Sequence, residues 1–287
     1  MIAKARFLFF RLVNFISDLY VRCVLFFQIK SLPVGVVVEG GLGGQLLSIA
    51  IYRYLKNQGF CVFYDLRYFN KRPPLSESSL SQWEWQLDSF NISLKDLPSR
   101  KITVLNRFCL IRDSSFKFEL GLESISSAIN KNLISPTDSL KEEFQEQGLK
   151  NYMAVHLRQG DYLSVASFVP EYEDFYQYIR IFIKNVDQLV ILSDGKIPKK
   201  LLKKIEYLGK EVVLFPEGSS SPQLTHLIIQ RSHVSIISNS QFSLTAGIYS
   251  KVCLIPTRWN AYDKYNSILN KHISMGFLNT KTKKCSE

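Results

Sequence analysis

The sequence lacks most of the features that mark special classes of protein. Its five cysteines are odd in number and widely spaced, and no CxxC pair occurs, which argues against a disulfide scaffold and a zinc site. Such thiols fit a reducing cytosol. With 14 glycines and 10 prolines in 287 residues, the chain is neither collagen-like nor of low complexity. These absences leave an ordinary globular protein.

A long uninterrupted hydrophobic run is also lacking. Residues 7–27 are strongly apolar. Charges at Arg11, Asp18 and Arg22 divide them, and the charge-free runs fall short of the roughly 20 residues that span a bilayer. No small-residue cleavage site follows, which argues against a secretory signal.

The polar positions of this segment recur at helical spacing. They are Lys4, Arg11, Asn14, Asp18 and Arg22, which fall on one narrow stripe of a helix. A wide apolar surface beside a thin basic stripe is typical of a helix in the membrane interface. A helix packed on the protein's own core or on a partner chain has the same pattern. We expect an amphipathic helix over residues 1–31, and peripheral membrane contact through residues 4–28 under the first alternative.

Acidic residues are outnumbered, since 25 of them face 36 basic residues and leave a net charge of +11. The excess favours an anionic partner, such as acidic lipid or the pyrophosphate of a nucleotide. No zinc-finger, RNA-recognition or helix-turn-helix pattern accompanies the charge, so we expect no nucleic-acid partner.

Apolar, β-branched runs alternate with amphipathic segments beyond residue 31. We predict strands at 34–38, 60–64, 152–157, 188–192, 211–214, 234–237 and 252–255. The predicted helices lie at 46–58, 142–149, 172–184, 199–208, 221–230 and 242–249. Such alternation predicts an α/β fold with parallel sheets covered by helices. We expect two Rossmann-like domains facing a cleft, at residues 32–150 and 151–287.

Ligands of open parallel sheets bind at the carboxyl ends of the strands. The strand at 152–157 leads into His156, Arg158 and, after a glycine, Asp161. Arginine at a strand end offers a planar fork to phosphate, and the histidine can add a second donor. A structural Arg–Asp pair beside a core histidine would give the same pattern.

Two further polar segments follow strands of the same domain. Asp194 either caps the next helix or faces the cleft, where it could touch hydroxyl groups of a ligand. The segment with Asn239, Ser240, Phe242 and Ser243 opens a helix, whose unpaired N–H groups favour an anion. An N-cap cluster that binds no ligand is the alternative.

A glycine-rich turn runs from Glu39 to Gln45. It lacks the lysine and hydroxyl of a P-loop, and it is not the GxGxxG of dinucleotide-binding folds. Gly41, Gly43 and Gln45 are the residues that we expect to line a cleft on this side.

The order of these segments resembles one family. GGLGxQ, HLRxGDY, SD and NSxFS occur in turn, followed by the strand KVCLIP. The bacterial α-1,2-fucosyltransferases (glycosyltransferase family 11) typically read GGLGNQ, HIRRGDY, FSDD and NSTFSWWGAW. The likeness covers residues 36–260 and is thin between 60 and 150. This chain resembles a divergent member, because Gln159 replaces the second arginine, Gly44 the asparagine, and Leu244 and Thr245 the two tryptophans.

The resemblance implies a GT-B-like fold and an inverting transfer from GDP-β-L-fucose, without a catalytic metal or other cofactor. It implies that Arg158 holds the donor phosphate and that His156 and Asp161 occupy the motif's histidine and aspartate positions. It also implies that Ser240, Phe242 and Ser243 lie near the guanosine diphosphate. Residues 151–287 would then bind the donor and residues 32–150 the acceptor.

The expected function is therefore fucosyl transfer to a hydroxyl, the 2-OH of galactose, on a surface glycan or lipid-linked oligosaccharide. Such an enzyme of polysaccharide biosynthesis would be cytoplasmic and peripheral on the inner face of the cell membrane. The catalytic base stays open among Glu39, Asp161 and Asp194. Two alternatives also stay open: a transferase of the same fold with another nucleotide sugar, and a non-catalytic, membrane-associated binding protein.

Overall fold

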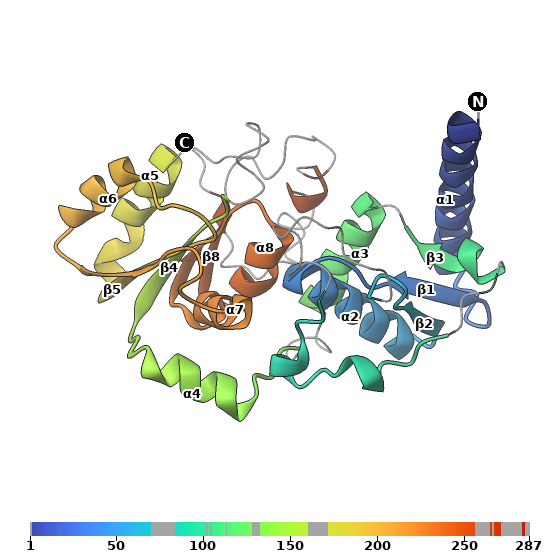
Figure 1. The fold of residues 1–287 in the computed structure, drawn as a ribbon, viewed down its shortest axis with the longest axis horizontal. Coiled ribbons are helices and arrows are strands. Elements are labelled where there is room, and N and C mark those ends of the chain that lie inside the picture. The colour runs from blue at the N-terminus through green and yellow to red at the C-terminus, as the bar shows by residue number, and fades with distance from the viewer. Residues whose placement is uncertain are drawn as a thin grey trace. The chain divides into compact units, whose positions relative to one another are not determined.

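The computed structural model describes residues 2–69, 84–100, 103, 105–112, 114–127, 133–159, 172–255, 265, 267–270 and 283–284. For residues 2–11, 105 and 283–284 it describes the backbone only. The chain divides into two compact units, drawn in Figure 1. Unit 1 comprises Met1–Asp88 and Ile92–Ile134, and unit 2 comprises Ser89–Asn91 and Ser135–Glu287.

Unit 1 is built on a parallel sheet with the strand order β2-β1-β3. Its strands are β1 (Pro33–Val37), β2 (Cys61–Asp65) and β3 (Leu110–Ile111), and its helices are α1 (Ile2–Phe26), α2 (Leu42–Asn57) and α3 (Ser114–Ser126). Short 3₁₀ helices lie at Asp88–Phe90, Leu94–Asp96 and Leu105–Cys109. The middle strand needs its glycine, because a Cβ on Gly35 would lie 2.3 Å from Leu110 Cδ2 and 2.7 Å from Phe63 Cζ.

Unit 2 contains a larger parallel sheet with the order β6-β5-β4-β7-β8-β9. The strands are β4 (Tyr152–Leu157), β5 (Gln188–Ser193), β6 (Glu211–Phe215), β7 (Val234–Ile236), β8 (Val252–Ile255) and β9 (Lys283–Lys284). The helices are α4 (Asp138–Glu146), α5 (Tyr172–Phe182), α6 (Lys199–Glu206), α7 (Pro222–Arg231) and α8 (Gln241–Gly247), with a 3₁₀ turn at Ile183–Asn185. Every residue of β4 is buried, as expected of a central parallel strand.

The predicted fold class is confirmed, since both units are α/β with parallel sheets. Strands β4 and β8 have the predicted bounds, whereas β3, α3 and β9 were not predicted. The predicted domain boundary lies after residue 150, whereas the compact units meet at Ile134 and Ser135, with Ser89–Asn91 also in unit 2. The physical reason is that α4, expected to close the first domain, packs against α7 in unit 2. The cleft between the domains stays a prediction.

Helix α1 packs on unit 1 through one face only. The Ser17 hydroxyl donates to Leu110 O (2.6 Å) and accepts from Leu110 N (3.1 Å), while Val21 and Val24 are buried. Asp18 of the polar stripe accepts from Arg112 N (3.2 Å). This face of α1 therefore packs on the protein's own core, as the second alternative expected. Asp18, from the polar stripe, lies beside the packed residues.

The opposite face of α1 and the turn after it are exposed and apolar. Exposed fractions run from 41% to 81% for Leu12, Phe15, Ile16, Leu19, Phe26 and Phe27. Large apolar side chains gathered in this way are unusual on a soluble surface and point to a contact. In the described part of the chain, no helix combines the length and the apolarity that crossing a bilayer requires.

Candidate functional site

The carboxyl end of β4 is fixed by the segment that follows β7. The Ser238 hydroxyl donates to the carbonyl oxygen of His156 and accepts from the backbone N–H of Arg158, at 2.8 Å. Since β7 is the neighbour of β4 in the sheet, this side chain joins the ends of adjacent strands. The backbone of His156 and Arg158, on either side of Leu157, is thus held by Ser238.

Asp194 reaches this strand end from β5. Its carboxylate accepts from the backbone N–H of Gln159 (2.6 Å) and forms an ion pair with the Arg158 guanidinium. Both side chains of the pair are about one quarter exposed, so Arg158 remains accessible to a ligand. The capping alternative for Asp194 is wrong: Pro198 occupies the N-cap of α6, and no side chain caps that helix. The carboxylate instead orients the guanidinium.

His156 lies in β4, two residues before Arg158, and is buried. Its Nδ1 is 2.6 Å from the Ser243 hydroxyl oxygen, and its ring centroid is 5.3 Å from that of Phe242. Burial lowers the pKa of His156 to about 4, with Asp194 opposing the shift and Arg158 adding to it. The imidazole is therefore neutral near pH 7, and it can offer a ligand a hydrogen bond but no charge.

The turn that opens α8 is an N-cap cluster. The Ser240 oxygen accepts from the backbone N–H of Ser243 (3.1 Å), and the two hydroxyl oxygens are 2.8 Å apart. Asn239 is buried beside them. Ser240, Ser243 and His156 thus form one hydrogen-bonded chain, which fixes the imidazole from α8.

No sequence pattern pointed to His226, which lies on the buried face of α7. Its Nε2 is 3.2 Å from the Thr245 hydroxyl, and its ring packs against Phe242 and Phe90, with centroids 5.4 and 5.7 Å away. Burial, with a smaller contribution from His156, lowers the pKa of His226 to about 3. In a helix with apolar period a single histidine is not distinguishable from a core position, so no pattern could have found it.

Gln159 replaces the arginine that the family motif would place there. Its side chain is buried, and its amide nitrogen donates to the Tyr172 hydroxyl (2.9 Å). The neutral amide therefore fills a protein-lined position beside Arg158. A guanidinium at this buried position would add a second positive charge next to the first.

The residues predicted on the acceptor side lie in unit 1. Glu39 follows β1 and is half exposed, 3.4 Å from Lys117 Nζ. That ammonium also donates to Val37 O (2.7 Å), and burial lowers the pKa of Lys117 while Glu39 opposes the shift. Glu39 keeps an exposed carboxylate, as a base would need.

The expectation that Gln45 lines a cleft is wrong. Its side chain is fully buried: Nε2 donates to Gly40 O (2.9 Å) and Glu84 O (2.8 Å), and Oε1 accepts from Gln86 N (3.0 Å). The side-chain amide of Gln45 uses these hydrogen bonds to connect the glycine-rich turn to residues 84–86. Its role is structural, because no polar atom is left for a ligand.

The glycines around it have separate roles. Gly40 adopts a left-handed φ of +76°, which favours glycine. Gly41 is the N-cap of α2, and a Cβ added there or on Gly40 would meet nothing within 4 Å. Gly43 is buried in the first turn of α2. As far as the described residues show, the turn therefore leaves open space next to Gly40 and Gly41.

The structure brings together one group of predicted residues in unit 2, at the carboxyl end of its sheet. This group is His156, Arg158, Asp194, Asn239, Ser240, Phe242 and Ser243. Asp161 lies outside the described residues. The described residues include no group of three His, Cys, Asp or Glu side chains that could hold a metal ion.

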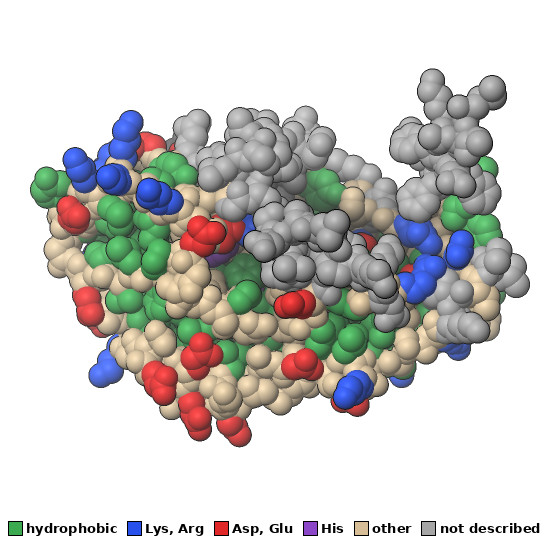
Figure 2. Space-filling view, viewed as in Figure 1, with side chains coloured by type: hydrophobic (Ala, Val, Ile, Leu, Met, Phe, Trp, Pro, Cys, Tyr) green, Lys and Arg blue, Asp and Glu red, His purple; other side chains and the backbone are tan. Residues whose placement is uncertain are grey.

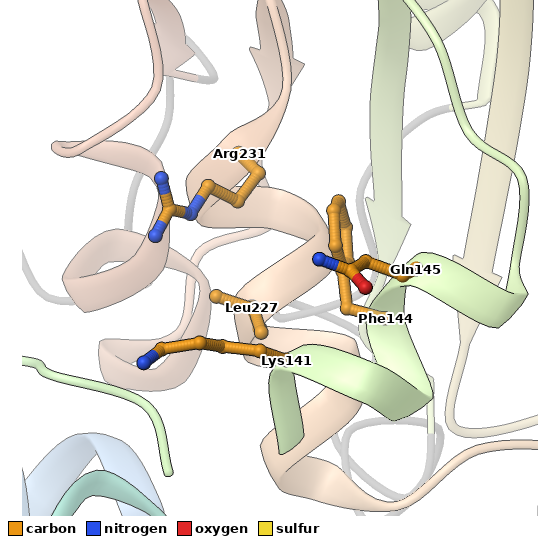
Figure 3. Close-up of a pocket in the computed structure, with 5 residues that line it drawn as sticks. All are labelled: Lys141, Phe144, Gln145, Leu227 and Arg231. Atoms are coloured by element: carbon orange, nitrogen blue, oxygen red, sulfur yellow. The ribbon is translucent and has the colours of Figure 1, made fainter. Parts of the chain in front are cut away.

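A cavity of about 250 Å³ lies elsewhere in unit 2, between α4 and α7 (Figure 3). It is lined by Lys141, Phe144, Gln145, Leu227 and Arg231. Arg231 ends α7 just before β7 begins, so the cavity lies toward the amino end of the sheet. None of its lining residues belongs to the group at the carboxyl end.

No family model and no curated protein matches the chain. Among solved structures it is similar to NodZ alpha-1,6-fucosyltransferase co-crystallized with GDP, with 14% identity over 78% of this chain and 94% of that chain and a TM-score of 0.41. It is also similar to POFUT1 in complex with GDP, with 9% identity over 76% of this chain and 94% of that chain and a TM-score of 0.42. For POFUT1 in complex with GDP-fucose, the identity is 10% over 76% of this chain and 93% of that chain, and the TM-score is 0.39. Identities and scores this low do not carry an activity to this chain.

Proposed function

We propose that the chain is an inverting, metal-independent glycosyltransferase that moves fucose from GDP-β-L-fucose to a hydroxyl of a glycan. The observation that carries the proposal is Arg158, a partly exposed guanidinium at the carboxyl end of a central parallel strand, aimed by Asp194. Ligands of such sheets bind at this edge, and a guanidinium matches the geometry of phosphate. The order of the four sequence motifs supports the choice of donor.

In the proposed reaction the acceptor oxygen attacks the anomeric carbon of fucose. The bond from that carbon to the β-phosphate oxygen breaks, its electron pair leaves with GDP, and the hydroxyl proton passes to a base. Arg158 offsets the charge that develops on the diphosphate. His156 contributes as a neutral hydrogen-bonding group, because burial keeps its pKa near 4.

The choice of base narrows to two candidates. Asp194 already accepts from Arg158 and from Gln159 N, so a proton on its carboxylate would weaken the contacts that orient Arg158. Glu39 has an exposed carboxylate, which suits a base, and Asp161 stays a candidate from the sequence.

The test is GDP binding by calorimetry, with GDP release from GDP-fucose as the second readout. Arg158→Ala should weaken GDP binding by about a hundredfold, since charge-assisted hydrogen bonds to a diphosphate are lost. Arg180→Ala, an exposed arginine on α5, is the matched control and should bind like the wild type. Undiminished binding by Arg158→Ala would exclude this donor site.

A second candidate is a transferase of the same fold with another nucleotide sugar. Gln159 motivates it, because the donor pocket carries one positive charge fewer than the family motif would supply. A thermal-shift panel of GDP, UDP, ADP and CDP separates the two, since the nucleotide of the true donor should give the largest stabilisation.

We also propose that the protein acts on the inner face of the cell membrane, where α1 would contact lipid beside a lipid-linked or surface-glycan acceptor. The exposed apolar face of α1 supports this placement, as do five Lys and Arg against one Asp within residues 1–32. A non-catalytic membrane-associated binding protein would share these features but would not turn over GDP-fucose.

Deleting α1 would be a poor test, because Val21 and Val24 are part of the core. The double variant Phe15→Ser, Leu19→Ser removes apolar area from the exposed face alone. It should weaken sedimentation with phosphatidylglycerol vesicles by at least tenfold, since each side chain contributes roughly 1.5–3 kcal/mol when buried. Tyr207→Ser, at an 89% exposed residue of unit 2, is the control and should leave sedimentation unchanged. Full sedimentation of the double variant would remove the membrane role of this face.

A further inference from the structure

Charged side chains that the sequence motifs do not include meet at the carboxyl edge of the unit 1 sheet. Asp65 ends β2 and Arg112 follows β3, and both strands flank β1 in register, with Val37 opposite Asp65 and Val36 opposite Ile111. The two residues therefore lie on either side of the end of β1. Lys and Arg side chains gather over α1 and β3 in this part of unit 1 (Figure 2).

Asp65 and Arg67 form a fixed pair at this edge. The Arg67 guanidinium donates to both carboxylate oxygens, at 2.9 and 2.7 Å, and the Arg67 backbone N–H donates to one of them, at 3.1 Å. The Asp65 side chain is only 3% exposed, whereas Arg67 is 40% exposed. Burial acts to raise the pKa of Asp65, but the bonds from Arg67 and the nearby Arg112 outweigh it and lower the pKa. The carboxylate thus stays ionised and orients a guanidinium that faces solvent.

Arg112 brings a second guanidinium to the same place. Its Nε is buried and has no hydrogen-bond partner among the described residues. Burial lowers its pKa, as do Arg67 and Arg107, while Asp65 and Asp18 oppose the shift. Both oxygens of the Asp65 carboxylate accept hydrogen bonds from Arg67, so Asp65 offsets the charge of Arg112 only from a distance, and positive charge is in excess around the half-buried Arg112 guanidinium. An unneutralised charge in such a position is costly, and an anion placed there would offset it.

We infer that Arg67 and Arg112 form a binding site for an oxyanion, a phosphate or a carboxylate, at the carboxyl edge of the unit 1 sheet. The planar forks of two arginines match such a group, and Asp65 keeps one of them in place. This part of the inference is independent of the proposed function. If the proposed function also holds, the acceptor carries the anion, so the preferred acceptor is an acidic or phosphate-bearing glycan.

The test uses the full chain and inorganic phosphate as the probe, with binding measured by calorimetry. Phosphate would also bind at Arg158, so the measurement is made in the Arg158→Ala background. There, phosphate should still bind, and adding Arg112→Gln should weaken it by at least tenfold. Arg112→Lys keeps the charge but not the planar fork, so it should weaken binding less than Arg112→Gln does. Arg53→Gln, an exposed arginine on α2, is the matched control and should change nothing.

The possible outcomes separate this site from the donor site. Absence of phosphate binding in Arg158→Ala, or equal binding with and without Arg112→Gln, would overturn the inference. Loss of binding in Arg112→Lys as severe as in Arg112→Gln would also contradict it, because charge would then not be the cause. GDP binding by Arg112→Gln at wild-type strength would leave the proposed function standing whichever way phosphate behaves. A parallel titration with acetate shows whether a carboxylate can replace the phosphate.

Discussion

Arg158 supplies the positive charge of the candidate site, and the side chains around it fix the orientation of Arg158 and of His156. Asp194 orients the guanidinium, Ser238 fixes the backbone on either side of Leu157, and the Ser240–Ser243 pair holds the imidazole of His156. Arg158 is the one cation in this hydrogen-bonded set. The neutral partners can therefore be altered without removing the charge that would meet a diphosphate.

Asp194→Asn should separate orientation from charge. The amide can still accept from Gln159 N but forms no ion pair with Arg158, so the guanidinium loses its anchor. We expect GDP affinity to fall by roughly tenfold, less than for Arg158→Ala, with a similar loss in kcat/KM for GDP-fucose.

The pH profile of Asp194→Asn provides the check. A variant that lost activity only at high pH, or lost kcat with unchanged GDP affinity, would identify Asp194 as the base and contradict its positioning role. Asp187→Asn, at an exposed carboxylate hydrogen-bonded to Asn151, is the control.

The buried histidines predict how stability depends on pH. Their pKa values in the folded chain are about 4 for His156 and about 3 for His226, whereas an unfolded histidine titrates near 6.5. Below about pH 6.5 the unfolded chain therefore binds protons that the folded chain does not. The free energy of unfolding should fall by roughly 1 kcal/mol per histidine between pH 7.5 and 5.5.

Urea denaturation at these two pH values measures the effect, and His226→Gln should remove about half of it. Because carboxylates titrate mainly below pH 5.5, the histidines dominate this window. A pH dependence equal in the wild type and the variant would show that His226 is not buried in its neutral form.

At the scale of elements, the start of α2 depends on two glutamines. Gln45 ties the glycine turn to residues 84–86, and Gln86 Oε1 accepts from Leu42 N (3.1 Å), at the first residue of the helix. Because the N-cap Gly41 has no side chain to offer, Gln86 supplies the cap from a distant segment. The glycine-rich turn therefore has a structural role, because it connects the start of α2 to residues 84–86.

Gln45→Leu should lower stability without touching donor binding. Up to three backbone groups lose their partners, so we expect the free energy of unfolding to fall by about 2–4 kcal/mol. Urea denaturation measures this, with Gln58→Leu at the exposed end of α2 as a control that should stay within roughly 0.5 kcal/mol. GDP affinity should not change, and a large loss of affinity would return Gln45 to a functional role.

At the scale of the whole molecule, the division into two units separates the candidate sites. The arginine that would hold the donor lies in unit 2, whereas the glycine turn, Glu39 and the Arg67–Arg112 site lie in unit 1. A ligand that binds only one unit stabilises that unit by mass action and leaves the other as it was.

Calorimetric unfolding should therefore show two transitions, of which GDP shifts only one. At a concentration of about 100 times its Kd, GDP adds roughly 2.7 kcal/mol, which raises the Tm of unit 2 by about 5–10 °C. Phosphate added to Arg158→Ala should shift the other transition. A single transition that moves as a whole would mean that the units unfold together.

The sequence by itself determined the α/β class and the positions of most strands of unit 2. It also placed His156 and Arg158 at the end of β4, whose bounds were predicted correctly. These features are local: hydrophobic period and strand propensity are set by residues a few positions apart. In the same way, the amphipathic character of α1 followed from its own period.

Only the tertiary structure decided what these residues contact. Asp194 meets Arg158 across 36 positions, Gln45 meets Gln86 across 41, and Ser17 meets Leu110 across 93. Such pairs depend on the order of strands in a sheet, which no local pattern encodes. For the same reason the two-residue strand β3 was missed, and with it the place where Arg112 joins Asp65 and Arg67. Burial also depends on the tertiary structure. It keeps His156 neutral, and it gives Gln45 a structural role.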